Sequence, residues 1–459
     1  MRTDWLPPEL PQLTELLDPL VVERILARGP FAGLEMADLR LERIRYRPGR
    51  NCLLTWSVSV ESVESVESTE GTESIGSRHR THLSILAGRA GEGGGNLDQS
   101  LPVEAATAAG ALPLPGLTAL LWVFPQDRKL RGISALRAPE TLLGDLAEEI
   151  PGIDRRSALE IVQYVAERSC TVRIKLRDGA SWIYGKFYRP GESMRPWQLM
   201  NRLWQSESCR SGGLAIPAPL AHHPATESLW LQGLEGSPLA MSASIEQLAE
   251  TGRALGRLHA TPVDGLATIT GAERAAQLER AIGTITLVRP DLRQRLATLS
   301  GNLATGGMEP GGMKPGGMKS GGMKPEGMKS EGMDSPATLH GDLHLANIFG
   351  LGEGRIGLLD LDNMVRGERW IDLASLAAYL AYHGLVARHD PDLVEQQMGQ
   401  VRRGYESATG LVIEDRHWRE LVAHALLAER GYRSVTRLKP NLFANLERLL
   451  VMAERMVQS

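Results

Sequence analysis

The chain has 459 residues and a formal net charge of −4, so it lacks the basic excess that is typical of nucleic-acid-binding proteins. Its length predicts two or three domains. The three cysteines form no CxxC pair and are too few to cross-link so long a chain, which favours a reducing, cytoplasmic location. No segment offers about 18 uncharged apolar residues, and the first residues lack a basic start and an apolar stretch, so we expect no membrane span and no signal peptide.

Residues 1–150 contain a β pattern that recurs later in the chain. RYRPGRNCLLTW (45–56) and QYVAERSCTVRI (163–174) place Tyr, Arg and Cys at matching positions, and each predicts a strand, a turn and a second strand. The second copy is followed by an aromatic strand that carries Lys186, whereas the first is followed by HLSILAG, which has no lysine. We expect residues 1–150 to form a cap or a degenerate copy of one β unit; chance similarity of two hairpins is the alternative.

Two stretches are low in complexity, and both are interpreted as expanded loops. A three-residue SVE unit repeats over residues 57–67, and a five-residue Gly- and Met-containing unit repeats six times over residues 306–335. Neither period matches a solenoid repeat, which needs roughly 20 residues or more per unit. The second stretch is predicted to be disordered because Gly and Pro leave little to bury. Its evenly spaced methionines raise a second interpretation, a Cu(I)-binding or metal-buffering protein.

The remaining chain is β-rich at first and then mainly helical. Residues 151–235 are predicted to form a β-rich domain, which ends in the strand and Gly-containing linker of SLWLQGLEGSPL (228–239). Residues 236–459 are predicted to be α-rich, with Leu248, Leu255 and Leu258 at helical spacing and further helices from Ile371 onward. The predicted fold class is therefore α+β, with an additional N-terminal β-containing domain.

Polar residues cluster in LHGDLHLANIFGLGEGRIGLLDLD (339–362), between short apolar segments that predict strands. Asn347 follows Asp342 by five residues, the spacing of the catalytic loop in protein kinases. A hairpin with its turn at residues 350–354 would return Asp360 to the same place. Phosphoryl transfer needs a carboxylate that orients the acceptor hydroxyl, oxygen ligands for Mg²⁺ and a cation on the phosphates of ATP. The segment thus favours an ATP- and Mg²⁺-dependent enzyme.

The combination of HGDLHLAN and LLDLDNMVRGERWIDLA resembles the aminoglycoside phosphotransferase and choline kinase superfamily, from about Ile161 to the C-terminus. The resemblance implies a protein-kinase-like bilobal fold, with ATP and Mg²⁺ as cofactors and a hydroxyl of a small molecule as acceptor. It implies Asp342 as catalytic base and Asn347 and Asp360 as metal ligands. It further implies Lys186 on the phosphates and an adenine hinge made of Leu231, Gln232, Gly233 and Leu234. Supporting roles fall to the remaining polar residues of the motif: His340 and Asp372 as braces, Asp362 as an aid to metal or substrate, and His344 as either a substrate contact or a brace.

The sequence departs from the family pattern in the residues that would bind the phosphates of the nucleotide. YVAERSC (164–170) has no glycine where a Gly-rich loop is expected, which leaves Arg168 and Ser169 as candidates for phosphate contact. The glutamate that should pair with Lys186 is not defined, with Glu192, Gln198 and Glu207 as the options. These departures keep open a pseudokinase, a module that binds nucleotide or a partner without turnover.

The acceptor is only partly indicated by the sequence. Acidic and basic residues are nearly balanced from Ala337 onward, so a polycationic aminoglycoside is not favoured over a sugar or an amino alcohol. The N-terminal extension is similar to the cap domains of some bacterial sugar kinases, which also favours a carbohydrate.

Overall fold

The computed structural model describes residues 6–68, 71–88, 110–114, 116–177, 179, 181–305, 336–438 and 443–458. The chain divides into two compact units. The first unit comprises the described residues of Met1–Met194, Leu220–Gly233 and Val435–Pro440, and the second those of Arg195–Pro219, Leu234–Ser434 and Asn441–Ser459. The Met-rich repeat expected to be disordered at 306–335 lies outside the described residues.

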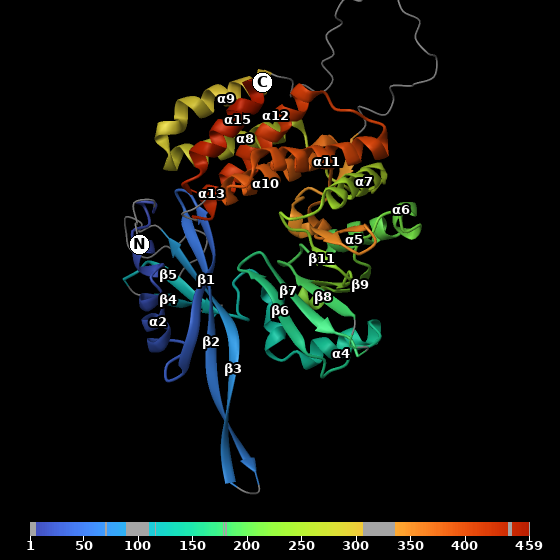
Figure 1. Ribbon diagram of the computed structural model, residues 1–459. Helices are drawn as coiled ribbons and strands as arrows, with labels where there is room; N and C mark the ends of the chain where they lie inside the picture. The colour runs from blue at the N-terminus through green and yellow to red at the C-terminus, as the bar shows by residue number, and fades with distance from the viewer. Residues whose placement is uncertain are drawn as a thin grey trace, which may run out of the picture. The chain divides into compact units, whose positions relative to one another are not determined.

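The first unit contains two five-stranded sheets with the same strand order (Figure 1). The N-terminal sheet has the order β1-β2-β3-β5-β4 and consists of β1 (Glu35–Arg47), β2 (Asn51–Ser68), β3 (Gly71–Gly88), β4 (Leu112–Leu114) and β5 (Ala119–Val123). The following sheet has the order β6-β7-β8-β10-β9 and consists of β6 (Leu159–Val165), β7 (Ser169–Lys175), β8 (Trp182–Phe187), β9 (Pro219–His223) and β10 (Ser228–Gln232). The helices of this unit are α1 (Leu13–Leu16), α2 (Pro19–Arg28), α4 (Glu140–Glu149) and the 3-10 helices η1 (Arg131–Arg137) and η2 (Pro224–Thr226).

The first hairpin of each sheet has the same register. Tyr46 pairs with Cys52 across β1 and β2, and Tyr164 pairs with Cys170 across β6 and β7. Each turn is closed by the same backbone hydrogen bond, from Arg50 N to Arg47 O and from Arg168 N to Val165 O. The sequence repeat therefore corresponds to a repeated fold element rather than to chance similarity.

The SVE repeat is not the loop expected from its low complexity. Residues 57–67 continue β2, and the ladder with β3 runs from Asn51↔Gly88 to Ser68↔Gly71. In Figure 1 the two strands form one long hairpin. The physical reason is that a β ladder pairs backbone groups, whatever the side-chain period, and that the β-branched valines favour extended backbone.

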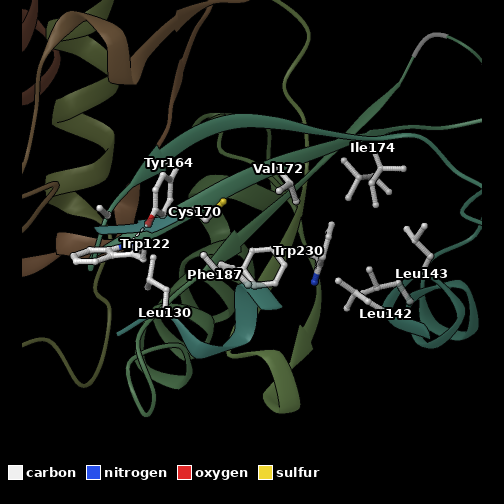
Figure 2. Packing of buried hydrophobic residues seen from close by; sticks show 14 of the residues in the cluster. Trp122, Leu130, Leu142, Leu143, Tyr164, Cys170, Val172, Ile174, Phe187 and Trp230 are labelled. Carbon is white, nitrogen blue, oxygen red and sulfur yellow. Dashed lines mark hydrogen bonds between the residues drawn. The ribbon is translucent and has the colours of Figure 1, made fainter. Parts of the chain in front are cut away.

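The two sheets of the first unit share a hydrophobic core (Figure 2). Leu53, Leu86 and Trp122 come from the N-terminal sheet, and Cys170 and Trp230 come from the second. The indole Nε1 of Trp122 also donates a hydrogen bond to the hydroxyl of Tyr164, at 3.2 Å. Each sheet therefore buries part of the other's apolar face.

The second unit is mainly helical. Its helices are α5 (Met194–Trp204, from Arg195 on), α6 (Glu207–Arg210), α7 (Ile245–Ala260), α8 (Gly271–Val288), η3 (Pro290–Leu292), α9 (Arg293–Thr305), α10 (Trp370–Ala387), α11 (Pro391–Thr409), α12 (Asp415–Ala425), the π-helix η7 (Leu426–Gly431), α13 (Tyr432–Thr436, up to Ser434) and α15 (Leu446–Gln458). Its short strands and 3-10 turns are β11 (Ser237–Pro238), β12 (Ala337–Leu339), η5 (Leu345–Asn347), β13 (Ile348–Gly350), β14 (Ile356–Leu358), η6 (Leu361–Asn363) and β15 (Val365–Gly367). Among the described residues, no helix combines the length and apolar character needed to cross a membrane.

Candidate active site

The predicted hairpin after the HGD motif is present. β13 and β14 pair from Ile348↔Leu358 to Gly350↔Ile356, with the turn at the expected glycines. Beyond the ladder, Leu359 N donates to Asn347 O at 2.9 Å, so that Asp360 follows directly beside Asn347. The strand ends at Leu358 rather than at Leu361, because Asp360 has a left-handed backbone (φ 57°) that ends the extended run.

Asp372 holds the loop that precedes Asp342. Its carboxylate accepts hydrogen bonds from His340 N (2.6 Å) and Gly341 N (3.0 Å), and it lies 3.1 Å from His259 Nε2. His340 is itself buried, and its Nε2 donates to Leu359 O at 2.8 Å. Burial raises the pKa of Asp372, but the hydrogen bonds from His259 and the loop outweigh it and hold that pKa below its usual value. The loop is thus anchored to α10 by a fully buried carboxylate.

Asp342 forms an ion pair that the sequence did not reveal. Arg433 Nη2 in α13 donates to Asp342 Oδ1 at 2.7 Å. Burial of Asp342 raises its pKa, while the neighbouring charge of Arg433 lowers it, and the net pKa lies below the usual value. The side-chain Nδ2 of Asn347 donates to Asp342 O at 3.0 Å, which brings these two motif residues together.

His344, Tyr379 and Arg430 form a second group in the same unit. The His344 ring stacks on Tyr379 with centroids 5.8 Å apart, and the guanidinium of Arg430 lies 5.3 Å from the centre of the Tyr379 ring. Burial lowers the pKa of His344, which favours the neutral imidazole. Two buried nitrogens here, His344 Nδ1 and Arg430 Nε, have no hydrogen-bond partner among the residues that the structure describes.

The π-helix η7 explains why these arginines were missed. It interrupts the helical period between α12 and α13, contains Arg430 and ends just before Tyr432 and Arg433. π-helical turns are rare and frequently occur at functional sites. The sequence signal for these residues is the pair of arginines three residues apart, directly after Glu429.

Asp362 and Asp360 lie in and beside the turn η6. Arg195 donates to the backbone oxygens of Asp362 (3.3 Å) and Met364 (3.0 Å) and thereby fixes this turn. Asp360 is exposed. Within the described ranges, no group of three or more His, Cys, Asp or Glu side chains is arranged to hold a metal ion.

The residues expected to bind nucleotide lie in the first unit, apart from Leu234. Lys186 is in β8, paired with Thr171 and Leu229, and its Nζ lies 5.7 Å from the centre of the Tyr188 ring. Leu231 and Gln232 end the neighbouring β10, and Gly233 N donates to Trp182 O at 2.7 Å. Arg168 and Ser169 lie at the β6–β7 turn.

Three residues were considered as the partner of Lys186, and two of them form ion pairs with arginines close to them in sequence. Glu192 pairs with Arg189 at 3.4 Å, and Glu207 pairs with Arg210 at 3.6 Å. Gln198, the third option, lies in α5.

Comparisons with known proteins identify the family of this chain. Residues 186–421, just over half of the chain, match the model of a phosphotransferase enzyme family. No curated protein matches this chain. Similar solved structures include a choline kinase from Cryptosporidium parvum, with 11% identity, coverage of 70% of this chain and 95% of that one, and a TM-score of 0.49. A macrolide 2'-phosphotransferase from Brachybacterium faecium has 18% identity, coverage of 68% and 98%, and a TM-score of 0.42. On the family match, the chain belongs to the phosphotransferase enzyme family.

Proposed function

We propose that the chain is a kinase that uses ATP and Mg²⁺ to phosphorylate a hydroxyl group of a small molecule. The observation that carries this proposal is the arrangement around Asp342, an ionised carboxylate beside Arg433 on a loop that also holds Asn347. A carboxylate at this place orients the acceptor hydroxyl and accepts its proton. The buried contacts of His340 and Asp372 support the proposal that these two residues keep the loop rigid.

The metal ligands in this proposal are Asn347 and Asp360. Asn347 uses its Nδ2 for the loop, which leaves the amide oxygen for a cation, and Asp360 offers an exposed carboxylate next to it. One amide oxygen and one carboxylate fit Mg²⁺, which takes few protein ligands and completes its shell with phosphates and water. The ion, when bound, neutralises charge on the transferred phosphoryl group. Asp362 is proposed to assist the metal or the substrate.

The nucleotide contacts in this proposal come from the first unit, apart from Leu234. Lys186 supplies the cation for the phosphates, and Arg168 and Ser169 contact them from the β6–β7 turn. The backbone of Leu231, Gln232, Gly233 and Leu234 receives the adenine edge. Residues 1–150, 151–235 and 236–459 are proposed as cap, nucleotide lobe and α-rich lobe. A cytoplasmic location and the absence of a nucleic-acid partner stay predictions.

A sugar is the acceptor class that the surroundings of Asp342 favour. Arg433 pairs with Asp342 and Arg430 pairs with Glu429, each at 2.7 Å, so these surroundings offer no excess of negative charge to a polycationic aminoglycoside. The guanidinium of Arg430 already lies over the ring of Tyr379, 5.3 Å from its centre, where a quaternary ammonium group would compete with it. Burial lowers the pKa of His344, and its Nδ1 has no partner within the described ranges, so it is a suitable hydrogen-bonding contact for a hydroxyl.

The test is an assay of ATP consumption, with Mg²⁺, over matched panels of neutral sugars, amino alcohols and aminoglycosides. We expect turnover with at least one sugar and none with aminoglycosides. Turnover restricted to cationic acceptors would contradict the acceptor class but keep the kinase. Nucleotide binding without turnover on any acceptor would contradict the kinase and favour the pseudokinase.

A further inference from the structure

The β6–β7 turn contains a residue in a conformation that normally belongs to glycine. Glu167 has a φ of +60°, and the equivalent position of the β1–β2 turn is Gly49, with a φ of +70°. A left-handed backbone at a residue with a side chain costs roughly 1–2 kcal/mol and persists only where the surroundings enforce it. Glu167 is also completely buried, although it lies in a turn.

Basic residues from outside the turn enclose the Glu167 carboxylate. Arg45 Nη2, in β1 of the N-terminal sheet, lies 2.7 Å from Glu167 Oε2. Arg128 Nε donates to Oε1, and Lys129 Nζ lies 3.7 Å from Oε2. Burial raises the pKa of Glu167, but these cations, with Arg128 foremost, bring it below its usual value. Glu167 is therefore an ionised, buried anchor.

The backbone of Glu167 is fixed as well. Its N–H donates to Asp127 Oδ2 at 2.7 Å, the same oxygen that accepts from the Tyr164 hydroxyl. Its carbonyl oxygen accepts from Arg189 Nε at 2.6 Å. The conformation of the turn is thus set mainly by residues that precede β6, including one from the N-terminal sheet.

Among the described residues, this anchoring leaves two arginines without a carboxylate partner. Arg168, next to Glu167, is exposed at the turn. Arg43 lies two residues before Arg45, so both side chains leave the same face of β1. Arg43 is half-buried, and within the described part of the chain no carboxylate pairs with it or with Arg168. Burial and, second, the charge of Arg168 lower the pKa of Arg43, as expected of two guanidinium groups close together.

We propose that Arg43 and Arg168 together bind phosphate groups of the nucleotide, and that Glu167 and Arg45 are positioning residues that present Arg168. Two guanidinium groups near each other attract an anion and bind phosphate oxygens through charge-assisted hydrogen bonds. The N-terminal sheet then contributes directly to the nucleotide site. A turn held in place by Glu167 also accounts for the missing glycine. The inference rests on the proposed function only for the identity of the ligand as ATP.

The experiment measures the affinities of the full-length chain for ATP, adenosine and inorganic tripolyphosphate. The variants are Arg43→Met and Arg168→Met, with Arg50→Met as the matched control, because Arg50 occupies the position of Arg168 in the β1–β2 turn. We expect each of the first two to weaken ATP binding about tenfold, the loss of one charge-assisted contact. Adenosine affinity should not change, and Arg50→Met should bind ATP like the unmodified chain.

Three results would overturn the inference. ATP binding unchanged by Arg43→Met would exclude a contribution from the N-terminal sheet. Equal losses for ATP and adenosine would show a structural effect. Loss of tripolyphosphate binding with ATP binding unchanged would assign the arginines to a separate phosphate compound. These affinities do not depend on turnover, so failure of the proposed kinase reaction is distinguished from failure of this inference.

The positioning role needs its own variants. Glu167→Gln keeps the shape of the side chain and removes its charge, and Arg45→Met removes one partner. We expect both to weaken ATP binding, and the double variant Glu167→Gln/Arg168→Met to bind no more weakly than Arg168→Met alone. Additive losses in the double variant, with adenosine affinity also reduced, would contradict positioning. Thermal denaturation of each variant verifies that it is folded.

Discussion

Gly341, directly before Asp342, is required by the packing of the loop that contains Asp342. It has a φ of +80°, and a Cβ there would lie 2.1 Å from Asn363 O. Gly354 has a similar φ of +72° but open space around the Cβ position. We expect Gly354→Ala to lower the free energy of unfolding by about 1–2 kcal/mol, and Gly341→Ala to lower it by several kcal/mol and to reduce turnover. Urea unfolding measures the free energy of unfolding of both variants. Equal losses would contradict the close contact of residue 341 with Asn363 O.

Arg433 is expected to set the acidic limit of activity. Its charge opposes the effect of burial and holds the pKa of Asp342 below the usual value, so Asp342 is ionised above that pKa. Removing the charge in Arg433→Met should raise the pKa of Asp342. On acidification, the variant should then lose activity at a higher pH than the unmodified chain does. We expect the acidic limb of kcat/KM to move up by about 1 pH unit or more, with Arg433→Lys moving it less. An unmoved limb would show that Arg433 does not act through Asp342.

The sequence predicts some of these residues and not others for a physical reason. Asp342 and Asn347 share a short loop, so their spacing alone brings them together. Arg433 is 91 residues from Asp342, and Arg45 is 122 residues from Glu167. Such pairs depend on how distant elements pack, which local pattern does not encode.

Among the elements, short hairpins were predictable, and irregular elements were not. The β13–β14 hairpin and the repeated hairpins at Tyr46 and Tyr164 are confirmed. The SVE segment was wrongly expected to be a loop because of its low complexity, although its backbone forms a ladder. The π-helix η7 has no periodic signal of its own.

Helix α12 contains a buried titratable group that should make stability depend on pH. His424 is buried, and its Nε2 donates to Arg274 O at 3.1 Å. Burial, and then the charge of Arg274, lowers the pKa of His424 to about 4. The unfolded chain takes up this proton near pH 6.5 and the folded chain only near pH 4, so stability is lost as the pH falls between these values, by up to about 3 kcal/mol.

The measurement for His424 is the unfolding free energy at pH 7 and pH 5. His424→Gln cannot bind the proton, so its stability should fall less over this interval than that of the unmodified chain. An identical fall in both proteins would mean that His424 is not the titrating group.

For the whole molecule, the α+β class expected from the sequence is confirmed by the sheets and helices of the two units, and the phosphotransferase family is confirmed by the family match. The domain boundaries at residues 150 and 235 stay predictions. The shared core of the two sheets could not be predicted, because the sequence repeat indicates similar elements but not which faces they bury against each other.

The shared core predicts the effect of removing the N-terminal sheet. Residues 151–459 alone would expose Tyr164, Cys170 and their neighbours, which share a core with Trp122 (Figure 2). Leu53 belongs to the same core. We expect this fragment to aggregate or to bind a hydrophobic dye strongly, in contrast to the full-length chain. A monomeric fragment that binds ATP like the full-length chain would contradict both the shared core and the contribution of Arg43.

The most direct test of the central claim is transfer of the labelled γ-phosphoryl group of ATP to an accepted hydroxyl compound, by the unmodified chain and by Asp342→Asn. The account predicts transfer that falls by several orders of magnitude in the variant, with ATP affinity nearly unchanged, since Asp342 acts on the acceptor hydroxyl. Transfer retained in Asp342→Asn would contradict the assignment of Asp342 as the catalytic base.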